Sequence, residues 1–195
     1  MSQLLTAAET IASLPTMRCT LERYHRMIEG GVFDERDRVE LLFGKLVPMS
    51  PVGILHGKVV NQLLRQFTQR LPAEEFTIGV QNPVTLVDDS EPEPDLYVAR
   101  GPLQRYDHHP YPADLLLIVE VSDSTLAYDR SAKKVTYAVA GIEEYWIVNV
   151  FEKQVERYTL PQPDGTYSRR EIFRPGGTVS SLHVGAFAVE DLLVD

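Results

Sequence analysis

Cysteine is scarce in this chain, since Cys19 is the only one among 195 residues. A disulfide framework and a zinc site built from several thiolates are therefore excluded. Long apolar runs are also missing, because no stretch approaches the roughly 18 residues that a membrane-spanning helix needs. Met1–Leu14 lacks the basic start and apolar core of a secretory signal. We therefore expect a cytoplasmic protein without a membrane partner.

Basic residues are outnumbered, with 19 Lys and Arg against 28 Asp and Glu and a net charge of −9. This balance argues against avid, nonspecific binding of nucleic acid, which draws its affinity from basic side chains on phosphates. A nuclease remains compatible with it, because a divalent metal and a local basic patch can oppose the overall sign.

Repeats, low-complexity tracts and linkers are absent as well, and 44% hydrophobic with 24% charged residues is an ordinary globular balance. The length suits one domain over residues 1–195. We expect helices in 1–38, a core in 39–150 and C-terminal β-strands in 151–195.

The most informative segment runs from Asp114 to Val150 and predicts a strand, a helix and a second strand. Leu115–Val119 is an apolar run without alternation, typical of a strand covered on both faces. The helix is expected to begin after Ser124 or Thr125 and to end at Gly141, and Tyr145–Val148 is the returning strand. A crossover of this length implies parallel strands in a right-handed βαβ unit.

Helical periodicity predicts which face of that helix is buried. Residues at i, i+4, i+7 and i+11 would form the apolar stripe, which comprises Tyr128, Ala132, Val135 and Val139. Lys133 would lie at the edge of this stripe, with Tyr137 one turn further on the same side.

The remaining elements follow from shorter patterns. Helices are expected over 4–14, 20–28 and 56–70, a β-hairpin over 39–49, and strands over 76–87, 95–99, 154–160 and 167–173. Pro83 could interrupt the first of these strands. Together they predict an α/β fold whose mixed β-sheet is flanked by helices, with a central βαβ unit and antiparallel edge strands.

Four residues could carry chemistry. Glu40 opens the hairpin, Asp95 follows Pro94 at a strand start, Glu120 closes a strand, and Lys133 lies on the next helix. A carboxylate at the end of a buried strand is costly unless it is paired or binds a metal, and that end is where open α/β sheets place ligands. Carboxylates suit Mg²⁺ or Mn²⁺, and a lysine can orient an activated water or offset developing charge.

At these residues the chain resembles the Uma2 family of predicted endonucleases in the PD-(D/E)XK nuclease superfamily. The matching stretches are Glu40–Gly44, Met49–Pro51 with His56, Glu93–Asp95, and Val119–Ser122 through Asp129, Lys133, Tyr137, Gly141 and Glu144–Val148. The resemblance implies a restriction-endonuclease-like fold in which Asp95 and Glu120 bind the metal and Glu40 is an added catalytic acid.

The resemblance also implies where the catalytic lysine lies. In the plain superfamily pattern a lysine follows the second acid by two positions, but Ser122 stands there in this chain. The family is similar in carrying its lysine on the following helix, which indicates Lys133 rather than the adjacent Lys134. His56, Ser122 and Tyr137 are candidate supporting residues.

Simpler structural roles exist for each candidate. Asp95 could cap a turn, Glu120 could form an ion pair with Lys133 or Arg130, and Lys133 could extend along the helix edge to solvent.

The leading interpretation is a Mg²⁺- or Mn²⁺-dependent endonuclease that hydrolyses DNA phosphodiester bonds by metal-activated water. One alternative is a non-catalytic binding or self-association module on the same fold. Another is a metal-dependent hydrolase of small phosphate esters. A homodimer is expected, because two-fold dimers are common among enzymes that cut both strands of a duplex.

Overall fold

An uninterrupted buried strand lies at the centre of the molecule. All eight residues of β5, Leu115–Ser122, are buried, and so are all six of β6, Glu144–Asn149. The two strands pair in parallel from Ile118 opposite Tyr145 to Ser122 opposite Asn149. The parallel pair expected from the two apolar runs is therefore confirmed.

The computed structural model describes residues 16–34, 37–87 and 89–194, and the helix expected over 4–14 lies outside them. Six strands form one sheet in the order β3-β4-β5-β6-β7-β8. Every neighbouring pair except β5–β6 is antiparallel. The other four strands are β3 (Phe76–Gly79), β4 (Leu96–Arg100), β7 (Gln154–Pro161) and β8 (Tyr167–Phe173). The mixed sheet with antiparallel edges is thus confirmed.

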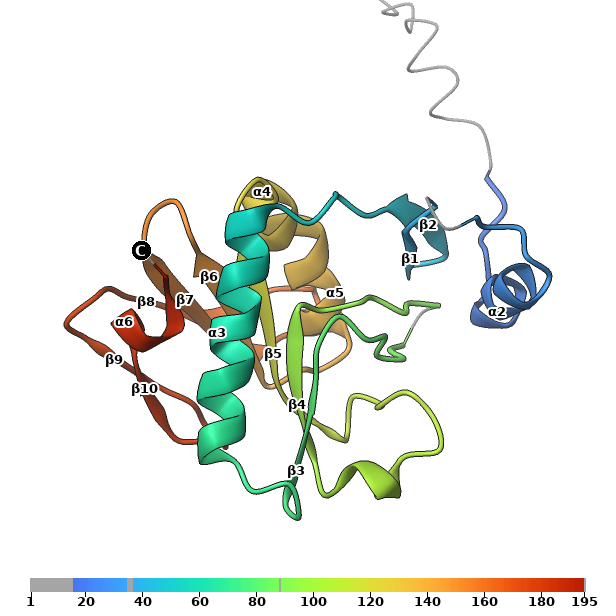
Figure 1. Ribbon diagram of the computed structural model, residues 1–195. Helices are drawn as coiled ribbons and strands as arrows, with labels where there is room; N and C mark the ends of the chain where they lie inside the picture. The colour runs from blue at the N-terminus through green and yellow to red at the C-terminus, as the bar shows by residue number, and fades with distance from the viewer. Residues whose placement is uncertain (1–15, 35–36, 88, 195) are drawn as a thin grey trace, which may run out of the picture.

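Helices cover both faces of this sheet (Figure 1). The long helix α3, Ile54–Arg70, lies in front in that view and packs Leu63 and Phe67 onto a core that includes Trp146. The same side carries β9 (Thr178–Ser180), β10 (Ala186–Ala188) and α6 (Val189–Leu192). On the other face, Tyr137 of the crossover helix packs in a second core of aromatic and aliphatic side chains.

The crossover between β5 and β6 contains a π-helical turn. It consists of α4 (Leu126–Tyr128), the π turn η2 (Asp129–Lys133) and α5 (Lys134–Val139). The backbone N–H of Lys134 donates to the carbonyl of Asp129, five residues back. The helix ends as expected, at Gly141 with a φ of 76°.

The predicted apolar stripe on this helix is wrong. Val135 is exposed and Tyr128, Ala132 and Val139 are only partly buried, whereas Asp129, Lys133 and Tyr137 are buried. The buried residues keep ordinary helical spacing, but the buried face lies one position along from the predicted stripe. Asp129 and Lys133 face inward because they bond to Ser122 and Glu40, respectively. Lys133 consequently lies at the centre of the buried face and not at its edge.

The strand expected over 76–87 is much shorter than predicted. It ends at Gly79, and Gln81 follows with a φ of 50°. The N–H of Gln81 donates to the carbonyls of Pro94 and Asp95 at 3.1 and 3.3 Å. Beyond Gly79 the pairing continues only as single bonds, from Val84 N to the Pro92 carbonyl and from Leu86 N to the Ser90 carbonyl. The chain passes beside Asp95, and Pro83 lacks an N–H for regular pairing.

An N-terminal arm lies outside the sheet, to the right in Figure 1. It consists of α2 (Leu21–Glu29) and the hairpin of β1 (Val39–Leu42) with β2 (Lys45–Pro48). The hairpin turns at Phe43 and Gly44, both with positive φ, as expected. Tyr24 of α2 donates its hydroxyl to the carbonyl of Val39 at 2.9 Å. The arm matters for the site because β1 carries Glu40.

The helices found in residues 16–34, 37–87 and 89–194 include none that could span a membrane.

Glu144, at the start of β6, ties the sheet to the segment that joins β9 to β10. Its buried carboxylate accepts from Trp146 Nε1 and Arg157 Nε, both at 2.8 Å. It also accepts from Ser181 Oγ at 2.6 Å and Leu182 N at 2.8 Å. We predict that Glu144→Ala lowers the free energy of unfolding by about 3–5 kcal/mol, because four donors lose their partner, one of them a charged guanidinium.

The neighbouring Glu143 provides the matched control. Its side chain is 62% exposed and makes an exposed pair with His183 at 2.7 Å, so Glu143→Ala should cost less than about 1 kcal/mol. Urea denaturation of the two variants measures the difference. Equal losses would show that Glu144 does not hold these segments together.

Candidate active site

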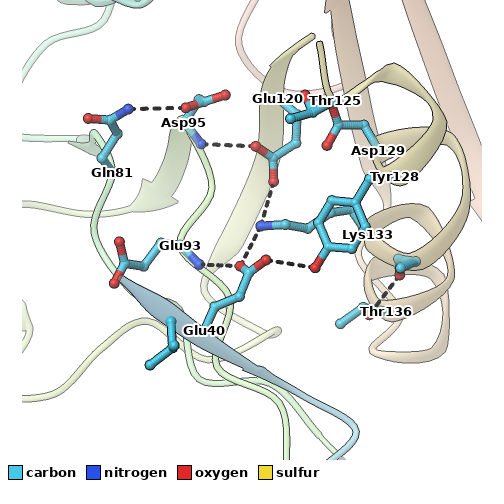
Figure 2. Close-up of polar contacts among 12 residues, drawn as sticks. Glu40, Gln81, Glu93, Asp95, Glu120, Thr125, Tyr128, Asp129, Lys133 and Thr136 are labelled. Atoms are coloured by element: carbon cyan, nitrogen blue, oxygen red, sulfur yellow. Dashed lines mark hydrogen bonds and ion pairs between the residues drawn. The ribbon is translucent and has the colours of Figure 1, made fainter. Parts of the chain in front are cut away.

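Lys133 occupies the centre of a buried polar cluster beside the end of β5 (Figure 2). The π turn directs its ammonium between two carboxylates. Nζ donates to Glu40 Oε2 at 2.6 Å and lies 3.2 Å from Glu120 Oε1. Burial alone would lower the pKa of Lys133, but Glu120 and Glu40 reverse that effect and raise the pKa above its usual value. Lys133 is therefore a cation at neutral pH.

Glu120 enters the cluster from the carboxyl end of β5. Its neighbours Val119 and Val121 point to the α3 side, so alternation along the strand turns Glu120 toward the crossover helix. Tyr137 donates its hydroxyl to Glu120 Oε1 at 2.6 Å. Burial, opposed by Lys133, raises the pKa of Glu120 to about 8. The carboxyl group is thus mostly protonated at pH 7 when no further cation is near.

Asp95 stands directly before β4 and reaches the same corner. Its backbone N–H donates to Glu120 Oε2 at 3.2 Å, and its Oδ2 accepts from the N–H of Val121 at 2.8 Å. His56 Nε2 lies 3.0 Å from the same Oδ2, and Gln81 Nε2 donates to Oδ1 at 3.3 Å. Burial would raise the pKa of Asp95, but His56 and these donors hold it below the usual value. Asp95 is therefore ionised.

Glu40 closes the cluster from the hairpin. Besides Lys133 it accepts from the Tyr128 hydroxyl at 2.8 Å and from the Glu93 N–H at 3.2 Å. Only 2% of Glu40 is exposed. The N-terminal arm, the end of β5 and the crossover helix therefore meet at one ion cluster.

The cluster opens into a pocket with a volume of about 440 Å³. Met49, Pro51 and Val52 contribute an apolar wall, and Asp123 with Ser124 lies among the residues on the β5 side. Asp129 also lines the pocket, and its Oδ2 accepts from Ser122 Oγ and Thr125 Oγ1, both at 2.6 Å. The candidate site is thus a partly open recess.

The donor set fits a Mg²⁺ or Mn²⁺ ion. Mg²⁺ is bound by one or two carboxylates while water and substrate phosphate complete its coordination. Asp95 and Glu120 both line the pocket, and the backbone N–H of Asp95 contacts the Glu120 carboxylate. The described residues contain no set of three His, Cys, Asp or Glu side chains arranged as a ready metal cage. A cation here would offset the surplus of carboxylates over Lys133.

The predicted residues divide into two groups by position. The structure brings Glu40, Asp95, Glu120 and Lys133 together, and His56 and Tyr137 contact the two expected metal ligands. Ser122 is fully buried and donates to Asp129, so it supports the helix start rather than these acids. The catalytic and metal-binding roles of these residues remain predictions.

Sequence reasoning missed two contacts in the cluster, from Tyr128 and Gln81. Tyr128 carries an aromatic ring at a helical spacing that indicates core packing, but its hydroxyl donates to Glu40. Gln81 was expected inside a strand. Its role depends on the early strand end at Gly79, for which the sequence carries no signal before Pro83.

Comparison with known proteins identifies a family and a similar fold. A family model described as "Uma2: Putative restriction endonuclease" matches residues 21–190. The fold is similar to the crystal structure of "a putative nuclease belonging to DUF820" from Anabaena variabilis ATCC 29413, with a TM-score of 0.67, 16% identity, and coverage of 89% of this chain and 96% of that one. No curated protein sequence matches. Since the family model covers most of its length, the chain belongs to the Uma2 family of restriction-endonuclease-like proteins.

Proposed function

We propose that this protein is a Mg²⁺- or Mn²⁺-dependent endonuclease that hydrolyses DNA phosphodiester bonds. The observation that carries the proposal is the meeting of Asp95, Glu120 and Lys133 in one buried corner that opens into a pocket. The family and the similar fold support a nuclease. The ion and the DNA substrate are our inference.

Asp95 and Glu120 are the residues that would hold the ion. Both lie at rigid elements of the central sheet. The hydrogen bond from the Asp95 N–H to the Glu120 carboxylate fixes their spacing. When bound, the ion supplies polarisation of the phosphate and a lower pKa for a bound water. His56 and Gln81 orient the Asp95 carboxylate, and Tyr137 orients that of Glu120.

Lys133 is suited to stabilise negative charge on the reacting phosphate. An ammonium has three N–H donors, and the contacts to Glu40 and Glu120 use two of them. The third is available to a phosphate oxygen or to the attacking water. Glu40 acts through Lys133, because it holds the ammonium in place and does not itself need to touch the substrate. A homodimer also remains a prediction, which sedimentation velocity can check.

We predict that Asp95→Asn, Glu120→Gln and Lys133→Gln each reduce DNA cleavage in Mg²⁺ or Mn²⁺ by about 100-fold or more. This is the scale on which one electrostatic contributor acts, and the amides preserve the side-chain shape of Asp95 and Glu120. The measurement is the rate of cleavage of labelled oligonucleotides, with thermal unfolding recorded for each variant.

Glu152→Gln is the control, because this acid at the β6–β7 turn is 45% exposed and pairs with Arg130 at 3.5 Å. It should cleave within about twofold of the wild type, as expected for a surface charge outside the site. Cleavage by all four variants at the wild-type rate would reject the site assignment. Cleavage at an unchanged rate in the presence of a metal chelator would reject metal dependence.

Metal binding should depend on pH, because a carboxyl group must lose its proton before it binds a cation. With the pKa of Glu120 near 8, Mn²⁺ affinity should rise about tenfold from pH 6 to pH 7 and level off above about pH 8. Lys133 keeps its proton across this range because its pKa is raised. Calorimetry at pH 7 in two buffers of different ionisation enthalpy should show release of about one proton per ion.

Two variants identify the source of that proton. Glu120→Gln should bind Mn²⁺ more weakly and lose the proton release. His56→Gln should keep the proton release. This control is needed because burial lowers the pKa of His56, but Asp95 outweighs burial and raises it. Proton release that persists in Glu120→Gln and disappears in His56→Gln would assign the titration to the histidine instead.

A further inference from the structure

Three basic side chains gather beside the crossover helix. Arg130 and Lys134 come from the helix itself, and Arg170 comes from β8. Arg130 Nε donates to Glu156 Oε1 at 3.1 Å, and Arg170 Nη2 donates to Glu156 Oε2 at 2.9 Å. Lys134 Nζ and the Arg170 guanidinium carbon each lie 5.8 Å from the centre of the Tyr158 ring. Because the three cations share these two neighbours on β7, they form one surface, which we call the basic patch.

The basic patch is accessible because β8 is an edge strand of the sheet. Glu156 and Tyr158 face the crossover helix, since one contacts Arg130 and the other belongs to the core beneath that helix. Their partners on β8 are Ile172 and Arg170, so these two side chains lie on the same face of the sheet. Ile172 is 40% exposed, and the side chain of Arg170 is 44% exposed. A ligand can therefore approach the patch over the outer strand.

A buried carboxylate holds two of the three cations in place without neutralising the patch. Glu156 is fully buried and also accepts from the Tyr158 hydroxyl at 2.7 Å. It takes two nitrogens of Arg130 and one of Arg170, while each guanidinium carries five N–H donors. Glu152 lies 3.5 Å from Arg130, so three cations face two acids. The guanidinium groups are thus fixed, and the planar fork of such a group matches the geometry of a phosphate.

The basic patch shares the crossover helix with the candidate active site. Asp129 and Lys133 line the pocket, and Arg130 and Lys134 are the residues that directly follow them in the chain. Arg130 and Lys134 are four residues apart, which is about 6 Å along a helix. A DNA duplex carries one phosphate charge per about 1.7 Å of its axis. A duplex with one phosphate at the pocket therefore presents several more over a distance comparable to this helix.

We propose that the basic patch of Arg130, Lys134 and Arg170 is a contact surface for the DNA backbone and binds phosphates that flank the one in the pocket. This inference rests on the proposed nuclease function and adds a binding surface to it. The patch supplies the local positive charge that a chain with a net charge of −9 needs to hold a polyanion. It also gives Lys134 a role in substrate binding that differs from the role of the adjacent Lys133.

The test measures binding of a labelled DNA duplex by fluorescence polarisation at several salt concentrations, in a chelator that prevents metal-dependent cleavage. For the wild type, the log–log slope of the binding constant against salt should be about −2.7, which corresponds to three phosphate contacts. Arg170→Gln and Lys134→Gln should each weaken binding about threefold or more and make the slope about 0.9 less steep, because each removes one contact. Arg170→Gln leaves Glu156 paired with Arg130, and thermal unfolding checks that the fold is retained.

Arg169→Gln is the matched control, because it removes the same charge from the neighbouring residue. Alternation along β8 turns Arg169 to the opposite face of the sheet from Arg170, where it pairs with Glu171 at 2.7 Å. Arg169→Gln should leave the affinity and the salt slope within error of the wild type. An effect of net charge alone would appear equally in both arginine variants. Equal binding by Arg169→Gln and Arg170→Gln would therefore overturn the inference.

Cleavage kinetics in Mn²⁺ separate failure of the inference from failure of the proposed function. Lys134→Gln should raise KM about threefold or more while kcat changes little, because it removes binding that is equal in the ground and transition states. A lower kcat with an unchanged KM would overturn the inference, since Lys134 would then act in the chemical step. Cleavage with no change of affinity in the patch variants would overturn it and leave the nuclease function standing. DNA bound through the patch but not cleaved would reject the nuclease function and keep the surface, and absence of both would reject both.

Discussion

The buried ion pair of Lys133 with Glu40, which Glu120 joins, is the interaction on which the rest of the site depends. It connects the hairpin to the crossover helix, since Glu40 and Lys133 are 93 positions apart in the sequence. Burying charge is costly, and replacing a buried ion cluster by well-packed apolar residues is often neutral or stabilising. A cluster of this kind therefore contributes little to stability that a simpler core could not supply. Its placement beside a recess is better explained by chemistry than by stability.

The two halves of the site differ in rigidity. Asp95 and Glu120 are linked through the backbone N–H groups of Asp95 and Val121, at the junction of β4 and β5 in the centre of the sheet. Glu40 comes instead from a hairpin outside that sheet. Functional groups hold their geometry best on rigid elements supported by hydrogen bonds to neighbouring groups. The candidate metal ligands have that support, whereas the position of Lys133 depends partly on how the N-terminal arm closes over it.

Much of this arrangement was accessible from the sequence, and the missing parts share a cause. Leu115–Val119 and Tyr145–Val148 predicted the parallel pair because a short, unbroken apolar run is typical of a strand that is covered on both faces. Glu120 and Asp95 could be identified from the sequence because each stands at one end of a predicted strand. The buried face of the crossover helix was not, because it carries Asp129, Lys133 and Tyr137, whose polar groups bond to other buried residues. An apolar pattern cannot reveal a face built on paired polar groups, and the predicted stripe therefore lay one position away.

The excess of acidic residues has a different consequence once the positions of the acids are known. Spread over the surface, a charge of −9 would mainly oppose binding to a polyanion. Six of the carboxylates line one recess, where their repulsion is strongest because water is partly excluded. There the same charge favours a divalent cation and disfavours phosphates that lack one. A negatively charged protein can therefore bind a phosphodiester when it contacts few phosphates and a metal ion lies between them and the acids. It cannot do so when its acids face many phosphates directly.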